Sequence, residues 1–392
     1  TKGLLLNQSR QDAQTNALLD SLHLSDIRAG TRVRTLTVAK QQMVEIAKAL
    51  SFSNTRILIM DEPTAALTES EIEDLFSFIR RLKAQGVGIV YISHKMEEIL
   101  RISDDVTIMR DGQWVATRPA KELTMDEIIR LMVGRPLTNR FPPKDNVVGD
   151  EDILKVEGLT AEYSHLKDAN IHVRKGEILG VAGLDSSGRT ELLENIFGSA
   201  TRKSGKIYKN GKLVGNKTPR ESIKNGFALV TEERRATGIL GILDIRANTV
   251  IASLKKYLNG PFLSDKKMAE ATDSMIKAMR IKTPSQQTKI NTLSGGNQQK
   301  VIFGRWILTQ PDVLLLDEPT RGIDVGAKYE IYQLIQDLAK QGKAVVMVSS
   351  EMPELLGVCN RIVVMSGGRV AGEVDADNTT QEEIMTLAAK YA

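Results

Sequence analysis

The stretch VLLLDEPT at Val313–Thr320 decides the fold, because a second copy, ILIMDEPT, stands at Ile57–Thr64. In each copy an apolar run typical of a buried strand ends at an acidic pair, and a proline then interrupts regular structure. A single copy would fit an ordinary junction between a strand and a turn. Two copies in register indicate a duplicated strand that ends in functional carboxylates.

Each copy follows a related motif, LTVAKQQ at Leu36–Gln42 and LSGGNQQ at Leu293–Gln299. In contrast, the sequence offers one candidate phosphate loop, GLDSSGRT at Gly183–Thr190. The chain therefore carries two sets of ATPase-type motifs but a single candidate loop for phosphates.

The internal repeat sets the fold class. Asp317 follows Asp61 by 256 positions, and this offset holds through the segments that follow. Apolar residues at helical spacing predict an amphipathic helix after each acidic pair, and a short apolar run then predicts a strand, Gly88–Ile92 or Ala344–Val348. Strand, helix and strand in this order predict an α/β fold with mainly parallel sheets, present as two tandem domains.

Composition places the domain boundary in residues 134–151. This stretch, GRPLTNRFPPKDNVVGDE, is rich in proline, glycine and charge and has no periodicity. We expect a first domain over residues 1–134, a linker over 135–152 and a second domain over 153–392. Subtracting the repeat offset from the phosphate loop gives a position before Thr1, so we expect the N-terminal part of the first domain, with its own loop, to be missing.

The bulk composition sets loose limits. The 392 residues suffice for about two domains, and 26 % charged with 4 % aromatic residues suit an α/β protein. A formal net charge of +4 permits a membrane-surface or nucleic-acid contact without favouring either. The one cysteine, Cys359, excludes an intrachain disulfide and is expected in the core. No apolar run approaches the ~20 residues needed to span a bilayer, so we expect any membrane role to be peripheral.

The candidate phosphate loop leads from a predicted strand into a predicted helix. Its glycines allow a tight backbone path, and successive N–H groups with the helix N-terminus can hold phosphates. Thr190 stands where a hydroxyl would bind Mg²⁺, while Arg189 replaces the expected lysine with a wider planar cation. Alone, the motif fits an ordinary glycine-rich turn equally well. The expected nucleotide-binding residues here are Gly183, Asp185, Ser186, Ser187, Gly188, Arg189 and Thr190.

The acidic pairs supply the expected metal ligands and bases. Asp61 and Asp317 are placed to hold a Mg²⁺-bound water, and Glu62 and Glu318 to polarise the attacking water. His94 follows the strand Gly88–Ile92 and could contact a γ-phosphate, although a structural histidine is the alternative. Ser350 stands at the equivalent place in the second half, so the two halves differ chemically.

The motif LSGGNQQ offers a second phosphate contact. Ser294 and the backbone of Gly295 and Gly296 can grip a phosphate at the start of a helix expected over 297–308, with Ser294 also acting as its cap. The first-half motif LTVAKQQ lacks both glycines, so we expect it to be a weakened version.

Together these motifs resemble the ABC-transporter ATPases, across essentially the whole chain. The duplication, TEERRATGI at Thr231–Ile239 and DEPTRGIDVGAK at Asp317–Lys328 are similar to the monosaccharide-import subfamily. The resemblance implies P-loop domains with helical subdomains, and a galactose or methyl galactoside cargo, with ribose or xylose next.

In that family, two ATPase domains stack head to tail, and each ATP lies between one domain's phosphate loop and the other's signature motif. The resemblance therefore implies ATP and Mg²⁺ as cofactors. It places Glu232, instead of glutamine, at the metal-binding Q-loop position. Tyr163 would stack on adenine, unless it is a core residue.

The resemblance also implies unequal sites. The second-half site has Arg189, Glu232, Ser350 and a weakened opposing signature, so we expect it to be regulatory or slow. We expect the site that combines LSGGNQQ, Glu62 and His94 to hydrolyse ATP in a longer parent, and the activity of this chain to be impaired.

The implied partners are membrane permease subunits and, through them, a periplasmic or extracellular sugar-binding protein. The chain would be peripheral, at the cytoplasmic face of the inner membrane, with no nucleic acid bound. Two alternatives remain. One is a duplicated ABC factor acting on ribosomes or nucleic acid, which the short proline-containing linker disfavours. The other is a fragment that binds nucleotide without turnover.

Overall fold

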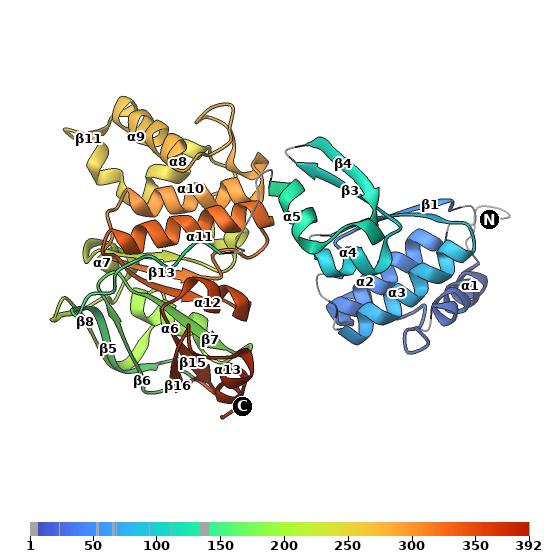
Figure 1. The fold of residues 1–392 in the computed structure, drawn as a ribbon, viewed down its shortest axis with the longest axis horizontal. Helices are drawn as coiled ribbons and strands as arrows, with labels where there is room; N and C mark the ends of the chain where they lie inside the picture. The colour runs from blue at the N-terminus through green and yellow to red at the C-terminus, as the bar shows by residue number, and fades with distance from the viewer. Residues whose placement is uncertain are drawn as a thin grey trace. The chain divides into compact units, whose positions relative to one another are not determined.

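The computed structural model describes residues 7–22, 24–51, 55–64, 67, 69–93, 95–110, 112–133 and 141–391. The chain divides into two compact units, Thr1–Pro136 and Leu137–Ala392, which Figure 1 shows in blue to cyan and in green to red. Among the described residues, no helix combines the length and apolar character that crossing a bilayer requires.

In the first unit, the described helices are α1 (Gln8–Ser21), α2 (Val38–Leu50), α3 (Glu69–Ala84), α4 (Met96–Ile102) and α5 (Met125–Val133), with short 3₁₀ turns at Val33–Thr35 and Ala120–Glu122. The described strands are β1 (Ile57–Asp61), β2 (Gly88–Ile92), β3 (Asp105–Arg110) and β4 (Gln113–Pro119). Strands β1 and β2 pair in parallel, and β3 and β4 form an antiparallel hairpin.

The core of the first unit lies on one face of the β1–β2 pair. Leu58 and Met60 of β1 are buried together with Leu75 and Phe76 of α3, whose apolar residues recur at helical spacing. On the opposite face Ile59 is 66 % exposed. This alternation follows from the two-residue period of a strand that is covered on one side only.

In the second unit, the helices are α6 (Arg189–Phe197), α7 (Pro219–Lys224), α8 (Ile245–Val250), α9 (Asp265–Ala278), α10 (Gly295–Ile307), α11 (Val325–Lys340), α12 (Met352–Val358) and α13 (Gln381–Ala388). A six-stranded sheet has the order β10 (Phe227–Val230), β13 (Val313–Asp317), β14 (Ala344–Val348), β7 (Ile178–Gly183), β15 (Arg361–Ser366) and β16 (Arg369–Asp375). All its neighbours are parallel except β15 and β16. A second, antiparallel sheet has the order β6 (Ala169–Arg174), β5 (Asp152–Ala161), β8 (Arg202–Lys209) and β9 (Lys212–Val214).

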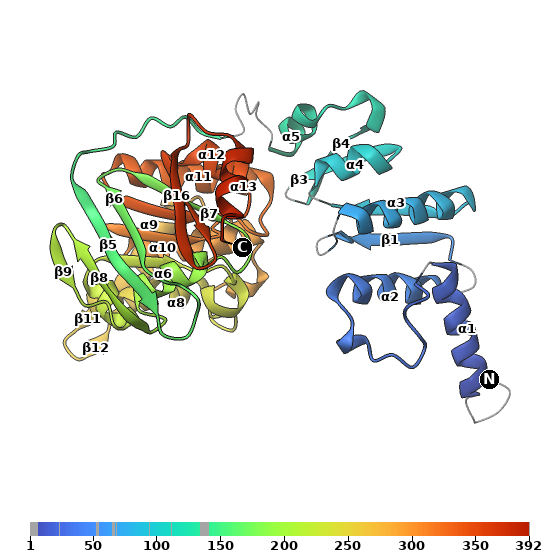
Figure 2. The same cartoon turned by 90° about the horizontal axis from the view of Figure 1, so that it is seen from below.

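The six-stranded sheet is buried on both faces. One face packs against α10, α11, α12 and α13, and the other packs against α6 and the antiparallel sheet. Figure 2 shows β5, β6, β8 and β9 beside each other at the edge of this unit. Double coverage explains why β13 and β14 are continuous apolar runs instead of alternating ones.

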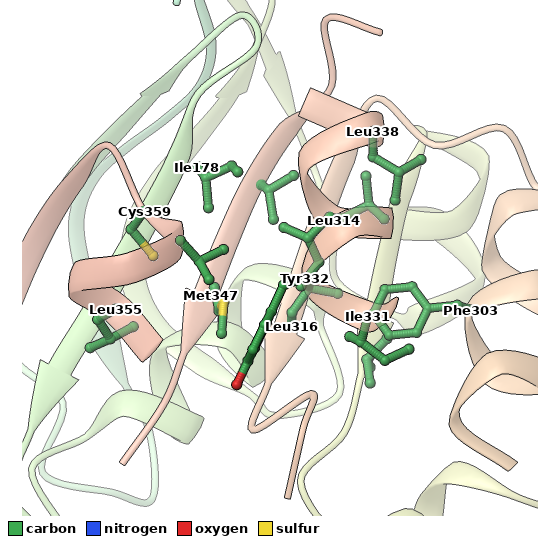
Figure 3. Close-up of a cluster of buried hydrophobic side chains, with 14 of the residues drawn as sticks. Ile178, Phe303, Leu314, Leu316, Ile331, Tyr332, Leu338, Met347, Leu355 and Cys359 are labelled. Atoms are coloured by element: carbon green, nitrogen blue, oxygen red, sulfur yellow. The ribbon is translucent and has the colours of Figure 1, made fainter. Parts of the chain in front are cut away.

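Cys359 lies in this core, as expected. Its side chain is fully buried between α12 and the sheet, near Leu355 and Met347 (Figure 3). Burial raises the pKa of the Cys359 thiol, which keeps it in the neutral form.

The predicted elements are confirmed around both acidic pairs. Strands β1 and β13 end at Asp61 and Asp317, and the parallel neighbours β2 and β14 have the predicted bounds. Helix α10 starts at Gly295, two residues earlier than the expected 297, and ends at Ile307.

The described part of the segment expected to be a linker contacts the second unit. Residues 134–140 lie outside the described part, but 141–151 run along the second unit and form polar contacts with it. Lys144 pairs with Asp377 at 2.6 Å, and Asp145 with Lys340 at 2.7 Å. The side-chain amide of Asn146 donates to the carbonyl oxygen of Gly176 and to Asn360. This half of the segment belongs structurally to the second unit.

Candidate functional site

The phosphate-loop candidate forms the turn between β7 and α6. A Cβ atom on Gly183 would lie 2.4 Å from Ser187 Oγ and 2.7 Å from the carbonyl oxygen of Met365, so only glycine fits there. Gly188 has a φ of +98° at the N-cap of α6, and Ser186 has a φ of +63°. These left-handed backbone conformations turn the loop back towards the start of α6.

The loop leaves polar groups free to bind an anion. Gly188 supplies no side-chain cap, so the first N–H groups of α6 keep their donor capacity. Ser187 is buried, and its Oγ has no hydrogen-bond partner among the described residues. A buried hydroxyl without a partner costs free energy unless a ligand or water satisfies it. The loop thus fits a phosphate group.

Arg189 reaches across the loop towards β14. Its Nη1 donates to the carbonyl oxygen of Ser349 at 3.3 Å, and its Nη2 lies 3.4 Å from an oxygen of Asp185. Its side chain is 11 % exposed, whereas Asp185 is fully exposed. Burial raises the pKa values of Asp317 and Glu318, and the charge of the nearby Arg189 guanidinium offsets part of this rise.

Asp317 lies at the end of β13, beside the loop. Burial raises its pKa to about 6, with a further contribution from the charge of Glu232, and the neighbouring Thr190 hydroxyl lowers it. Its Oδ1 is buried without a partner in the part of the chain that the structure describes. The structure thus brings together Thr190, Asp317 and Glu232, which are the predicted metal ligands of this half.

This arrangement fits a Mg²⁺ ion. The described ranges contain no group of three or more His, Cys, Asp or Glu side chains placed to hold a metal. Mg²⁺ in nucleotide sites needs fewer, since water and phosphate oxygens complete its octahedral shell. The unpaired Oδ1 of Asp317 and the hydroxyl of Thr190 are the two protein oxygens that suit it.

Glu318 follows in a strained turn. Its φ is +46°, and its N–H donates to the carbonyl oxygen of Val348 at 3.1 Å. Ser350 Oγ donates to Glu318 Oε2 at 3.2 Å. Burial raises the pKa of Glu318 to about 7, so the carboxyl can exchange a proton near neutral pH. The positive φ turns the side chain away from the strand direction, as functional turns often do.

Glu232, which the family resemblance places at the Q-loop position, follows β10. Its carboxylate pairs with Arg321, which comes directly after the second Asp-Glu-Pro-Thr segment. The pairing fastens the Q-loop position to the turn that carries Glu318.

The signature motif opens α10 as predicted, but its residues make other contacts than expected. Ser294 occupies the N-cap position without a side-chain cap bond, and its Oγ accepts instead from Asn297 Nδ2 at 2.9 Å. The prediction of Ser294 as the N-cap residue is confirmed, but its side chain forms no bond to a backbone N–H of the helix. A Cβ on Gly296 would lie 2.5 Å from the Cβ of Ala327, so this glycine is needed for packing against α11.

Gly295 makes room for a neighbouring arginine. A Cβ there would lie 2.9 Å from Arg234 Nη2 and 2.9 Å from the carbonyl oxygen of Gly322. Arg234 also donates from Nε to Gln298 Oε1 at 3.1 Å. The structure therefore gives both signature glycines a packing reason, beside the predicted phosphate contact.

Tyr163 lies after β5 and is 89 % exposed. The alternative that it is a core residue is wrong, and its stacking on adenine stays a prediction.

In the first unit, the acidic pair has the same backbone geometry. Asp61 ends β1, and Glu62 has a φ of +50° with its N–H donating to the carbonyl oxygen of Ile92 at 2.9 Å. This matches the bond from Glu318 to Val348. His94 lies outside the described residues.

Two functional candidates escaped the sequence reasoning. Glu98 and Glu354 are buried glutamates in the first turns of α4 and α12, and each accepts a hydrogen bond from the threonine of an Asp-Glu-Pro-Thr segment. Their separation by the repeat offset of 256 was a signal that could have identified them.

Comparisons with known proteins place these features in a family. Residues 166–321 match the protein family described as ABC transporter. The galactose/methyl galactoside import ATP-binding protein of Clostridium perfringens (strain ATCC 13124) is 55 % identical over 391 residues, which cover 100 % of this chain and 75 % of that protein. The protein of the same name from Escherichia coli (strain K12) is 54 % identical over 393 residues, covering 100 % and 77 %.

Solved structures share the fold. The ATP-binding cassette MJ1267 of an ABC transporter superposes with a TM-score of 0.53 at 20 % identity, covering 61 % of this chain and 99 % of that one. The ATP-binding cassette MJ0796 bound to ADP and phosphate gives 0.51 at 23 % identity, covering 58 % and 100 %.

Proposed function

Because this chain belongs to the ABC transporter family, among the galactose/methyl galactoside import ATP-binding proteins, we propose that it is the ATP-binding and ATP-hydrolysing subunit of a sugar importer. The observation that carries this proposal is the second-half site. There a glycine-dependent loop, an unpartnered buried hydroxyl and an unpartnered buried carboxylate oxygen surround the place of a phosphate.

We propose roles in this site from the loop geometry and, for Tyr163 and Glu232, from the family resemblance. The backbone of Gly183–Gly188, including Asp185, Ser186 and Ser187, and the cation of Arg189 hold the phosphates, and Tyr163 stacks on the adenine. Thr190 and Asp317, with Glu232 at their edge, hold Mg²⁺, which supplies charge neutralisation to the phosphates when bound. Glu318 accepts a proton from the attacking water and is oriented by Ser350.

The proposed second-half site is slow. Burial raises the pKa of Glu318 to about 7, so without bound ligands part of the molecules hold this carboxyl protonated at neutral pH. Arg189 is engaged by Ser349 and Asp185, so it contacts a γ-phosphate only after leaving those partners. We assign faster catalysis to the first-half residues Glu62 and His94, with Asp61 as metal ligand. Ser294, Gly295 and Gly296 are assigned a phosphate contact of their own at the start of α10.

The proposed organisation is two tandem ABC ATPase domains, residues 1–134 and 153–392, joined by 135–152. The equal backbone geometry at Glu62 and Glu318 supports it. The proposed partners are membrane permease subunits, with a periplasmic or extracellular sugar-binding protein acting through them. This places the chain at the cytoplasmic face of the inner membrane.

Two measurements test the function. Titration with Mg²⁺-ATP should show binding at Gly183–Thr190 that Asp317→Asn weakens, and absent binding contradicts the proposal. Reconstitution in vesicles with the cognate permease and its binding protein should give ATP hydrolysis that galactose or methyl galactoside stimulates. Stimulation by ribose or xylose alone would reassign the sugar, and co-purification with ribosomes instead of permease would contradict the transport role.

A further inference from the structure

A buried glutamate stands behind the acidic pair in each unit. Glu354 is 1 % exposed in the first turn of α12, and Glu98 is 5 % exposed in the first turn of α4. A carboxylate at such depth is costly unless cations and hydrogen-bond donors satisfy it. The donors therefore show what the carboxylate holds in place.

In the second unit, the donors to Glu354 come from three segments of the site. Thr320 Oγ1, two residues after Glu318, donates at 2.8 Å to Oε2. Ser349 Oγ, just before the Glu318 partner Ser350, also donates at 2.8 Å to Oε2. Glu354 is thus hydrogen-bonded both to the turn that carries Glu318 and to Ser349, which precedes Ser350, the donor to Glu318.

Helix α11 supplies the remaining donors. Tyr332 Oη donates to Glu354 Oε1 at 2.5 Å, and Lys328 Nζ donates to the same oxygen at 2.9 Å. Lys328 also pairs with Glu351 at 2.5 Å. Burial alone would raise the pKa of Glu354, but the charge of Lys328 and these bonds hold it below its ordinary value. The carboxylate is therefore ionised and fully engaged.

In the first unit, the acceptor is the same but the donors come from other positions. Thr64 Oγ1 donates to Glu98 Oε2 at 2.7 Å, which repeats the threonine contact. Tyr91 Oη donates at 2.8 Å, and Lys95 Nζ lies 3.1 Å from Oε1. Tyr91 belongs to strand β2, whereas Tyr332 belongs to helix α11.

The residues at the corresponding positions of the two units explain how the donors differ. Where the second unit has Tyr332 and Met347, which share one buried cluster (Figure 3), the first has Phe76 and Tyr91 at the positions related by the repeat offset. Where the second unit has Lys328 and Glu351, the first has Ile72 and Lys95. Among the described residues, one phenol and one ammonium reach the glutamate in each unit, and the threonine is the donor that keeps its place.

We propose that Glu354 and Glu98 are positioning residues, each of which fixes the turn that carries the glutamate of the Asp-Glu-Pro-Thr segment. The proposal rests on the proposed function, because it takes Glu318 and Glu62 as catalytic residues. Neither Glu354 nor Glu98 reaches the reacting atoms. They act through Thr320 and Ser349, or through Thr64.

Hydrogen exchange on the full chain tests the positioning without requiring turnover. Glu354→Gln keeps the shape of the side chain but replaces the carboxylate with a neutral amide that accepts weaker hydrogen bonds. The amide exchange rates of residues 317–322 and 349–354 should therefore rise at least tenfold. The exchange rates in α6 and β7 should stay within threefold. Glu98→Gln is the matched control in the same chain. It should leave 317–322 unchanged and raise exchange in 61–64.

A double variant that moves the lysine donor to the position it has in the first unit tests whether the perturbation comes from the lost contact to Glu354. Lys328→Ile should raise exchange in 317–322, and Lys328→Ile with Glu351→Lys should restore it to within threefold, because the double variant copies Ile72 and Lys95. The Glu351 side chain is 45 % exposed, and Lys328, at 16 %, stands where the first unit already holds the isoleucine Ile72, which limits the risk of misfolding. A double variant that is as perturbed as the single one, or unchanged exchange in Glu354→Gln, overturns the proposal.

Turnover separates positioning from stability. In a Glu62→Gln background, which leaves the second half as the source of turnover, Glu354→Gln should lower the kcat of ATP hydrolysis about tenfold and change KM less than twofold. A purely structural loss would lower the melting temperature with kcat unchanged. ATP binding without hydrolysis in the unaltered chain would overturn the catalytic role of Glu318 instead, and the exchange experiment would still decide the positioning.

Discussion

Glu318→Gln should stabilise the second unit at alkaline pH and have little effect at acidic pH. The carboxyl is 9 % exposed, and burial raises its pKa from the ordinary 4.5 to about 7. A group whose pKa is raised on folding takes up a proton in the native state that the unfolded state has already lost. Its ionisation therefore opposes folding, first as pH rises past 4.5 and in full above about 7.

The size of this effect follows from the two pKa values. Each pH unit between them contributes ~1.4 kcal/mol, so ionised Glu318 lowers the free energy of unfolding by about 3 kcal/mol at pH 8.5. At pH 5 the same relation gives less than ~1 kcal/mol. The glutamine variant keeps an oxygen that accepts from Ser350 but never carries the charge, so it should gain these amounts.

The assay is urea unfolding at pH 5 and pH 8.5, followed by tryptophan fluorescence. The chain has two tryptophans, so a Trp114→Phe background leaves Trp306 as the reporter of the second unit. Trp306 packs against Phe197, with ring centroids 5.8 Å apart, and its signal should change on unfolding. Glu270→Gln, on the exposed side of α9, controls for the loss of one negative charge. Equal stabilisation at both pH values, or none at pH 8.5, would refute the account of Glu318 as a buried charge that its neighbours compensate only in part.

Three further changes test the loop and the signature. Gly183→Ala should reduce Mg²⁺-ATP binding at least tenfold in calorimetry, because its Cβ would enter the loop, while Gly241→Ala, where nothing lies within 4 Å, should bind normally. Gly296→Ala should lower the free energy of unfolding by ~1–3 kcal/mol in denaturant titrations, since its Cβ would lie 2.5 Å from that of Ala327; an unchanged midpoint would contradict the packing role. Arg189→Ala should weaken ATP binding ~10- to 100-fold, the value of a hydrogen bond to a charged group, with Arg189→Lys retaining most of the affinity; equal affinities of all three proteins would remove Arg189 from the phosphate contacts.

The strands and turns around the acidic pairs could be predicted because their signals are local. An apolar run, an acidic pair and a proline within eight residues suffice to end β1 and β13 where the structure ends them. The role of the glycines in LSGGNQQ was predicted only in part, because their neighbours are distant in sequence. Ala327 follows Gly296 by 31 positions, and Arg234 precedes Gly295 by 61.

The segment after residue 141 shows the same limit. Its proline, glycine and charges are typical of a tether, and no local pattern reveals that Lys144 pairs with Asp377 or that Asn146 bonds Asn360. Glu354 escaped prediction for a related reason. Glu351 precedes Glu354 by three residues, and the sequence alone does not indicate which of the two carboxylates is buried.

The two units together constrain why the buried glutamates are present. Stability alone does not require them, since well-packed apolar residues of similar volume often replace a buried ion pair at no cost. Yet both units keep the carboxylate and its threonine contact while its other donors change places. The second unit does so although its loop carries Arg189 and its strand is followed by Ser350. A half that served only as packing would have no need to hold Glu318 in a left-handed turn above a satisfied carboxylate. The network found in both units supports the proposal that the second half uses this turn in its nucleotide site.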